Sequence, residues 1–270
     1  MMNDEPQQRW EQLIYPETQG IKNLLGIKDP THWEKIESRL TTARIVDLPY
    51  YGFTGDTVAE ELSAYHRTIF QDCYAWAGQF RTVDMSKDNL LNGGRTVFAH
   101  WQTIPQRLDE LNGIVDSLGD AQFDDAVSLL AYLHSELNEI HPFREGNGRT
   151  TRTYMSYLAQ RHDIIVDWDA AGTAQHYAAI VSMLGDELNH TPWHALYKEI
   201  CAPATWEDEA NTTLDEFGYD LSTFDYGQQI LNTLGLSTDT AGISHHSAPN
   251  TATTENQKPP EHHTSPEPEL

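Results

Sequence analysis

Between two helical patterns, residues 141–152 read HPFREGNGRTTR. Two glycines, Gly146 and Gly148, flank Asn147, so the backbone can turn tightly and approach a ligand closely. A helix that begins at Asn147 would point its free N–H groups and the positive end of its dipole at the same place. The stretch therefore predicts an anion cradle at the start of a helix.

Charged side chains around this cradle indicate a polyphosphate ligand. Arg149 and Arg152 lie three residues apart, so they share one face of the first helical turns and can both reach phosphate oxygens. Glu145 precedes the cradle and could hold the Mg²⁺ that such a ligand brings. Taken singly, the arginines indicate a solvated helix face and the glycines a simple turn. Their combination with Glu145 predicts a nucleotide site.

His141 ends the preceding helical pattern and lies close in sequence to the cradle. An imidazole with an ordinary pKa of about 6.5 can remove a proton from an attacking hydroxyl, so His141 is the candidate general base. A histidine at a helix end more often caps or packs, but its neighbours here favour catalysis. Phe143 alternates with these polar residues and is expected to point into the core, where it would hold the loop rigid.

Apolar residues at helical spacing occur on both sides of the motif. A leucine stripe over residues 129–137 is expected to be core rather than a groove for a partner. Helices are expected over about 32–49, from an Asp56 cap through Phe70, from Ile104 to near Gly119, from Asp124 to Ile140, from Asn147 to about His162, and around 172–188 and 192–201.

One segment has a different pattern. Residues Arg81–Met85 read as a short strand, Asn92-Gly93-Gly94 as a turn, and Thr96–Phe98 as a return strand, which together predict a hairpin. The fold class is therefore mainly α, with a single short β-hairpin.

The C-terminal end differs from the rest in composition. From residue 201 onward there are twelve acidic residues and one lysine, in a chain of net charge −24. We expect a helical domain with an N-terminal extension over 1–203, an acidic, partly ordered extension over 204–236, and a disordered tail rich in Pro, Thr, His and Glu over 237–270. Such a tail buries too little apolar area to offset its ordering entropy.

The overall composition excludes several classes of protein. The net charge of −24 argues against direct nucleic-acid binding and against capture by an anionic membrane, so a phosphate site must be locally basic. No stretch approaches the roughly 20 apolar residues that span a bilayer, and the polar opening over residues 1–5 lacks the features of a signal peptide. Cys73 and Cys201 form no paired-cysteine motif. These features predict a cytoplasmic protein.

Residues 141–152 resemble the Fic family pattern His-x-Phe-x-(Asp/Glu)-Gly-Asn-Gly-Arg-x-x-Arg and match it at every defined position. The resemblance covers roughly the first 200 residues, from 20–29 through 70–78 to Trp193. It implies a Fic-type helical bundle with a hairpin flap beside the active site. The hairpin at about 82–99 would be that flap, which lines up a target by main-chain pairing.

The resemblance implies a protein adenylyltransferase, which moves AMP from ATP onto a Ser, Thr or Tyr hydroxyl of a target protein. His141 would deprotonate the hydroxyl, and Glu145 would coordinate Mg²⁺. The backbone of residues 146–148, with the Asn147 side chain, would bind the phosphates, while Arg149 and Arg152 would clamp the β and γ groups. Among targets, the resemblance suggests the B-type subunit of DNA gyrase or topoisomerase IV.

The sequence looks most like the Fic toxins of bacterial toxin–antitoxin modules. Similar proteins are restrained by a helix bearing (Ser/Thr)-x-x-x-Glu-(Gly/Asn), whose Glu pairs with the second motif arginine, here Arg152. That pattern occurs at 251–256 and makes Glu255 a candidate autoinhibitory residue, but the surrounding threonines and prolines disfavour a helix. A separate small antitoxin that carries the helix is therefore favoured.

Two alternatives stay open at this point. A transferase on the same scaffold could use another donor, such as UMP, because the motif does not encode the base. A non-catalytic binding scaffold would be expected to lose His141 or a motif arginine, and none is lost.

Overall fold

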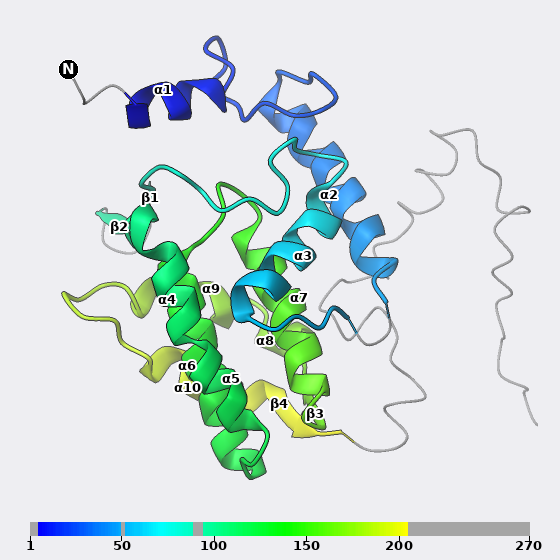
Figure 1. Cartoon of the computed structure of the whole chain (residues 1–270), viewed down its shortest axis with the longest axis vertical. Helices are drawn as coiled ribbons and strands as arrows, with labels where there is room; N and C mark the ends of the chain where they lie inside the picture. Colours follow the sequence, from blue (N-terminus) through cyan, green and yellow to red (C-terminus); the bar gives the residue numbers. More distant parts are fainter. Residues whose placement is uncertain (1–4, 50–51, 89–93, 205–270) are drawn as a thin grey trace, which may run out of the picture. The chain divides into compact units, whose positions relative to one another are not determined.

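Helices make up most of the computed structural model, which describes residues 5–49, 52–88 and 94–204 (Figure 1). The helices are α1 (Glu5–Gln12), α2 (Pro30–Val46), α3 (Val58–Phe70), α4 (Ile104–Glu110), α5 (Asn112–Leu118), α6 (Phe123–Ile140), α7 (Asn147–Gln160), α8 (Trp168–Ala171), α9 (Ala174–Val181) and α10 (Thr191–Ile200), with a 3₁₀ turn η1 (Trp101–Thr103). The strands form two antiparallel pairs, β1 (Ser86–Asp88) with β2 (Arg95–Val97) and β3 (Ile164–Val166) with β4 (Cys201–Pro203).

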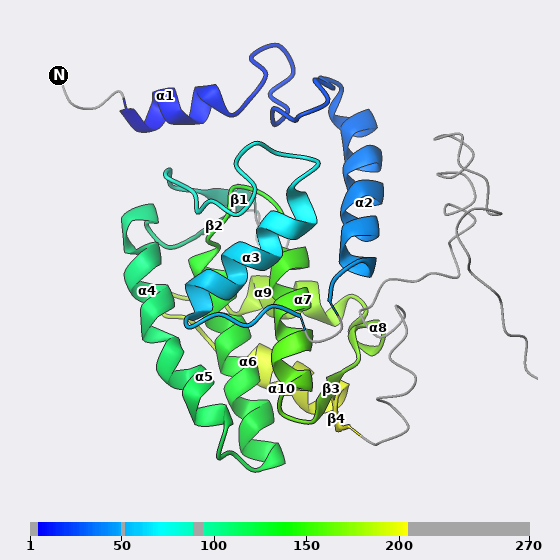
Figure 2. The same ribbon diagram turned by 45° about the vertical axis from the view of Figure 1, so that its right-hand side comes forward.

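The core lies around α6 and α7, which pack against each other. Helix α10 packs on α6, α3 packs on α7, and α2 covers α3 (Figure 2). This arrangement follows from the apolar stripes of the two central helices, whose innermost side chains are fully buried. They are Leu130, Leu133, Leu137 and Ile140 on α6 and Tyr154, Met155 and Ala159 on α7. The mainly helical fold with a short hairpin is confirmed.

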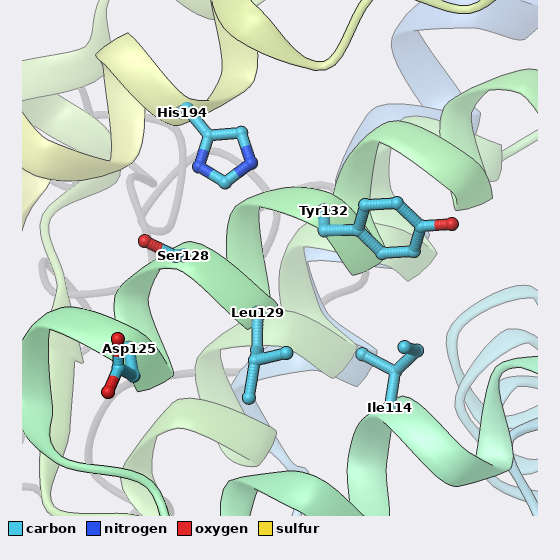
Figure 3. Close-up of a pocket in the computed structure, with 6 residues that line it drawn as sticks. All are labelled: Ile114, Asp125, Ser128, Leu129, Tyr132 and His194. Carbon is cyan, nitrogen blue, oxygen red and sulfur yellow. The ribbon is translucent and has the colours of Figure 1, made fainter.

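The leucine stripe is core except at its first residue. Leu133 and Leu137 are fully buried, as predicted. Leu129 is only half-buried and lines an apolar cavity of about 470 Å³ together with Ile114 and Tyr132 (Figure 3). The prediction of pure core was wrong at this one position, because Leu129 lies on the side of α6 that faces α5 and α10.

Two predicted helix boundaries need correction. Helix α3 is capped by Thr57, whose hydroxyl accepts from the Glu60 N–H at 3.2 Å, rather than by Asp56. The helix expected from Ile104 to Gly119 is broken at Leu111 into α4 and α5. Just after the break, the Asn112 side chain accepts from the first N–H of α3, on Val58, at 2.9 Å.

The C-terminal half also contains short elements that the sequence did not reveal. Of the helix expected over 172–188, only α9 is formed. A separate short helix, α8, lies before it and is capped by the Asp167 side chain. Cys201, expected to end a helix, begins β4 and pairs with Val166. Strands of three residues are too short for their alternation to be visible in the sequence.

The hairpin exists, but its first strand is displaced. The paired residues are Ser86–Asp88 and Arg95–Val97, with Lys87 opposite Thr96. The predicted strand Arg81–Met85 was therefore wrong, because the N–H of Arg81 donates to the Pro142 carbonyl at 2.8 Å instead of to a neighbouring strand.

Some predictions concern residues beyond those described. Asn92 and Gly93 of the predicted turn, the acidic extension after Ala204, the tail over 237–270 and Glu255 lie outside the described residues. Within the described ranges, none of the helices combines the length and the apolar composition that a membrane crossing requires.

Candidate active site

The candidate general base, His141, is the residue at which α6 ends. Its backbone is left-handed, with φ +48°, while its N–H still donates to the Leu137 carbonyl at 3.0 Å. For a residue other than glycine this conformation is uncommon and must be held by its surroundings. The turn brings the imidazole against the base of the hairpin, where it stacks on the Phe98 ring at 3.8 Å and 12°.

The surroundings of His141 keep its imidazole neutral. Burial lowers its pKa well below the ordinary value, and the charges of Lys87 and Arg81 lower it further, against a smaller opposing effect of the Asn138 carbonyl. Within the described part of the chain, Nε2 is buried and makes no hydrogen bond. A neutral ring with an unpartnered nitrogen can accept a proton from a substrate hydroxyl.

The loop after His141 is braced from inside by Asn147. Its side-chain oxygen accepts from the Phe143 N–H at 2.8 Å, and its side-chain nitrogen donates to the Phe143 carbonyl at 2.7 Å. The Asn147 side chain is buried and thus shapes the loop, which leaves its backbone N–H, at the start of α7, for the phosphate contact that the sequence predicted for this residue. Phe143 is buried, as predicted.

Gly146 is required for the turn into α7. It has φ +81°, and a Cβ built on it would lie 2.2 Å from Cζ of Phe70, which packs under the loop from α3. Gly148 is different: it is helical, and a Cβ there would meet only the Arg152 guanidinium at 3.4 Å. The first glycine therefore makes the turn, while the second lets Arg152 lie close to the start of α7.

His66 holds the other end of the loop, and the sequence analysis missed it. Its Nδ1 accepts from the Gly78 N–H at 2.8 Å, so Nε2 carries the proton and donates to the Glu145 carbonyl at 3.0 Å. The ring stacks on Phe143 at 3.9 Å and on Phe70 at 4.6 Å. Burial lowers its pKa to about 3, so the ring stays neutral. A histidine among the apolar residues of a buried helix face was the available signal.

The two motif arginines have different partners. Arg149 turns toward α2, where it pairs with Glu37 at 2.7 Å and donates to the Thr41 hydroxyl at 2.9 Å. Arg152 donates to the Gln175 side chain of α9 at 3.2 Å. The structure thus separates the pair that the sequence placed on one face. The phosphate contacts of both arginines remain predictions, and the anchoring role of Arg149 was not foreseen.

Glu145 lies at the lip of the loop, where it lines a cavity of about 330 Å³ together with Glu37 and Arg144. One carboxylate oxygen accepts from the Gly146 N–H at 2.9 Å, which leaves the other for a cation. No group of three or more His, Cys, Asp or Glu side chains suited to a metal occurs among the described residues. A single carboxylate fits Mg²⁺ that arrives on a nucleotide, since that ion keeps several waters and phosphate oxygens.

Comparison with known sequences identifies relatives of this chain. A sequence model of the Fic/DOC family matches residues 56–159. The protein adenylyltransferase VbhT of Bartonella schoenbuchensis is 36% identical over 158 residues, which are 57% of this chain and 32% of that protein. The probable protein adenylyltransferase Fic of Escherichia coli K12 is 30% identical over 164 residues, which are 57% of this chain and 75% of that protein. The chain thus spans about a third of VbhT.

Solved structures agree on the fold. BepC of Bartonella tribocorum, a VirB-translocated effector with bound AMPPNP, has a TM-score of 0.61 at 23% identity over 72% of this chain and 98% of that one. The N-terminal Fic domain of a Bep effector from Bartonella sp. AR 15-3 has a TM-score of 0.61 at 25% identity, over 76% of this chain and 95% of that one. With an intact motif at the start of α7, and with the Escherichia coli relative 30% identical and covered over 75% of its length, the chain belongs to the Fic/DOC family.

Proposed function

We propose that this chain is a protein adenylyltransferase that transfers AMP from ATP to a Ser, Thr or Tyr hydroxyl of a target protein. The observation that carries the proposal is the unpartnered, buried Nε2 of His141, six residues before a helix N-terminus built to bind phosphate. The names of relatives in Bartonella and Escherichia support the same reaction.

In the proposed reaction, the target hydroxyl gives its proton to Nε2 of His141 and its oxygen attacks the α-phosphorus of ATP. The bond from the α-phosphorus to the oxygen that bridges to the β-phosphate breaks, and diphosphate leaves. The free N–H groups at the start of α7 stabilise the charge on the leaving group. His141 then returns its proton to solvent.

The charged residues have separate parts in this proposal. Arg152, bound to Gln175 by one hydrogen bond, is the arginine better placed to turn onto the terminal phosphates. Arg149 holds α2 against α7 through Glu37. Glu145 would hold Mg²⁺, which, when bound with ATP, supplies neutralisation of the phosphate charge. Because ATP is a cytoplasmic metabolite, the proposal includes a cytoplasmic location for the reaction.

We also propose that the chain is a toxin restrained by a separate antitoxin, with a B-type topoisomerase subunit as its target. Within the described residues Arg152 hydrogen-bonds an amide and pairs with no carboxylate, so an inhibitory Glu from another chain could reach it. No feature of the described residues selects the target.

The test is labelling of a bacterial lysate with ATP carrying ³²P at the α or the γ position, in the presence of Mg²⁺. Wild type is compared with His141→Ala and with the control His162→Ala, whose histidine lies beyond the far end of α7. We expect α-label on a discrete protein band with wild type and the control, no band with His141→Ala, and no γ-label. Protein-bound γ-label, or α-label that survives His141→Ala, would contradict the proposal. Label from UTP alone would favour the other donor.

A further inference from the structure

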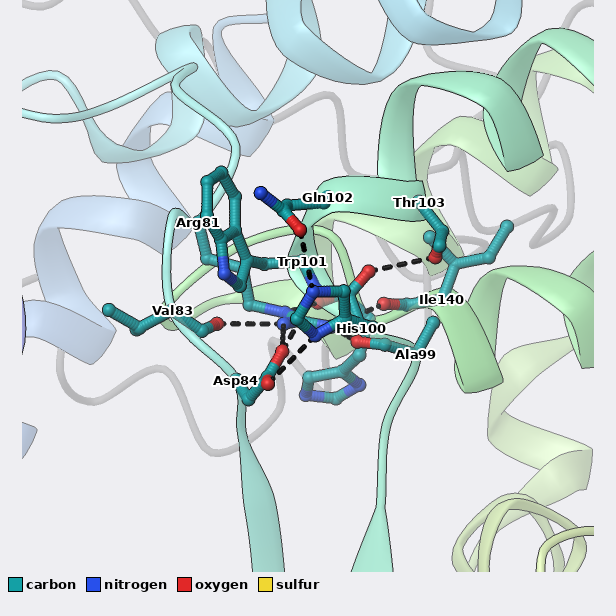
Figure 4. A network of polar contacts seen from close by, with 10 residues as sticks. Arg81, Val83, Asp84, Ala99, His100, Trp101, Gln102, Thr103 and Ile140 are labelled. Atoms are coloured by element: carbon teal, nitrogen blue, oxygen red, sulfur yellow. Dashed lines mark hydrogen bonds and ion pairs between the residues drawn. The ribbon is translucent and has the colours of Figure 1, made fainter. Parts of the chain in front are cut away.

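Arg81 lies between the end of α6 and the base of the hairpin, and its side chain is fully buried (Figure 4). The guanidinium donates to four backbone carbonyls. Nε donates to His141 at 2.9 Å, one terminal nitrogen donates to Val83 at 2.8 Å, and the other donates to Ile140 at 3.1 Å and to Ala99. Four of its five N–H groups are thus used on main chain that belongs to three separate segments.

One half of this network fixes the end of α6. The carbonyls of Ile140 and His141 have no partner inside the helix, and a cation beside them also balances the negative end of the helix dipole. The backbone N–H of Arg81 adds a bond to the Pro142 carbonyl at 2.8 Å. Three consecutive carbonyls therefore hydrogen-bond to one residue at the point where His141 adopts its left-handed conformation.

The other half fixes the hairpin base. Val83 precedes β1 and Ala99 follows β2, and the Ala99 N–H donates back to the Glu139 carbonyl of α6 at 3.0 Å. Asp84 accepts from the Trp101 N–H at 2.9 Å and contacts His100 at 2.8 Å (Figure 4). These contacts hold the segment that carries Phe98, on whose ring the imidazole of His141 stacks.

We propose that Arg81 is a positioning residue for His141. Its contacts with four carbonyls hold the turn that sets the orientation of the imidazole, and they connect that orientation to the base of the flap hairpin. The proposal rests on the proposed function, because aim matters only if His141 acts on a substrate. The Arg81 side chain is fully buried, so it would act through His141 and not on a substrate directly.

The geometry requires arginine at this position. Its planar fork presents five N–H groups in fixed directions, whereas lysine offers three from a single nitrogen. Burial lowers the pKa of Arg81 to about 10, so the guanidinium remains charged at neutral pH. Arg81→Lys would keep the charge and leave at least one carbonyl without its donor, so the turn at His141 would lose its fixed geometry.

The test compares Arg81→Lys and Arg81→Gln with Arg161→Lys. Arg161 is a matched control, because it is a partly buried arginine that binds Glu61 through two bonds of 2.7 Å at the far end of α7. Three quantities are measured: the transfer rate of α-label at saturating ATP, the dissociation constant of ATP with Mg²⁺ by calorimetry, and the ¹⁵N imidazole signals of His141.

For Arg81→Lys we expect a fall in transfer rate of about 100-fold, the cost of a misplacement near 1 Å. ATP affinity should stay within about threefold of wild type, since the start of α7 is held separately by His66 and Asn147. The His141 signals should move. Arg161→Lys should retain the transfer rate and the His141 signals.

The proposal is overturned if Arg81→Lys retains its transfer rate and its His141 signals. It is also overturned if Arg81→Lys and Arg161→Lys lose transfer rate and ATP affinity to the same extent, because that result would show that Arg81 only stabilises the fold. Should Arg81→Gln fail to fold, Arg81→Lys carries the comparison. Should wild type transfer no AMP, the proposed function fails, and the His141 signals in Arg81→Lys still decide whether Arg81 sets the orientation of the ring.

Discussion

At Gly146 the backbone turns into α7 with φ +81°, against the ring of Phe70. Gly146→Ala would place a methyl group inside that ring's space and impose a conformation that alanine avoids. We expect a loss of about 1–3 kcal/mol in the free energy of unfolding, measured with urea, together with weaker ATP binding.

Gly113 supplies the matched control for this prediction. It lies inside α5, and nothing stands within 4 Å of a Cβ built on it. Gly113→Ala should stabilise the protein by about 0.4–1 kcal/mol, because it restricts only the unfolded chain. Equal free energies of unfolding for the two alanine variants would show that the Gly146 turn has room for a methyl group beside Phe70.

The buried state of His141 gives a prediction about pH. A general base acts in its neutral form, and an imidazole with a pKa of about 6.5 would retain roughly a tenth of that form at pH 5.5. Because burial, Lys87 and Arg81 hold the His141 pKa well below that value, the neutral form persists there. The transfer rate at saturating ATP should therefore not fall tenfold between pH 7.5 and 5.5. A tenfold fall centred near pH 6.5 would place His141 in a more solvated setting.

At the level of single residues, the sequence predicted the motif but not what holds it. The turn at Gly146 and the burial of Phe143 followed from residue type and alternation. His66 and Arg81 support the motif loop from 79 and 60 residues away in the chain. Only the folded packing of α3 and the hairpin base brings them there. The apolar face around His66 could indicate a buried histidine, but no local pattern names the loop that either residue supports.

Among the elements, α2 is attached to the motif helix α7 by the Arg149 side chain, through a partly buried ion pair with Glu37 and a hydrogen bond to Thr41. Glu37 and Arg149 meet at 2.7 Å, and burial raises the pKa of Glu37 against the opposing effect of Arg149. The loss of either partner leaves the other charge poorly solvated, so the effects of Glu37→Gln and Arg149→Gln should not add.

A double-mutant cycle measures this coupling through urea unfolding of the wild type, both single variants and the double variant. We expect a coupling energy of about 1–3 kcal/mol. Additive effects would mean that α2 is held by its apolar contacts with α3 alone, and that Arg149 is available to a phosphate at no cost.

The elements that sequence periodicity located best are those whose hydrogen bonds stay inside the helix, such as α6 and α7. The elements whose bounds were predicted wrongly contain residues that hydrogen-bond to other parts of the fold. Val83 and Met85 are buried, as on the inner side of a strand, but the N–H of Arg81 bonds to Pro142 rather than to a strand. Likewise, the helix through 104–118 breaks where Asn112 reaches α3. Periodicity reports which side faces the core, not where backbone groups find partners.

Over the whole molecule, buried neutral histidines should make stability depend on pH. Burial lowers the pKa of both His66 and His134 to about 3, while in the unfolded chain each returns to about 6.5. Between these values the unfolded chain binds more protons, so stability falls as pH falls below 6.5. The expected loss is about 1.4 kcal/mol per histidine for each pH unit.

Urea unfolding at pH 7.5 and 5.5 measures this dependence. In His134→Gln the difference between the two pH values should shrink by about 1.4 kcal/mol, whatever the variant's stability at pH 7.5. A wild-type free energy of unfolding that is the same at both values would contradict the neutral, buried state of these rings.

If His141 directs AMP onto a protein hydroxyl, peptide mass spectrometry of the labelled lysate band will locate the modified residue. We expect one Ser, Thr or Tyr that carries the mass of an adenylyl group after treatment with wild type or His162→Ala, and the same peptide unmodified after treatment with His141→Ala. A peptide that carries a phosphate instead, or the same adenylylated peptide with His141→Ala, would show that His141 does not direct AMP transfer.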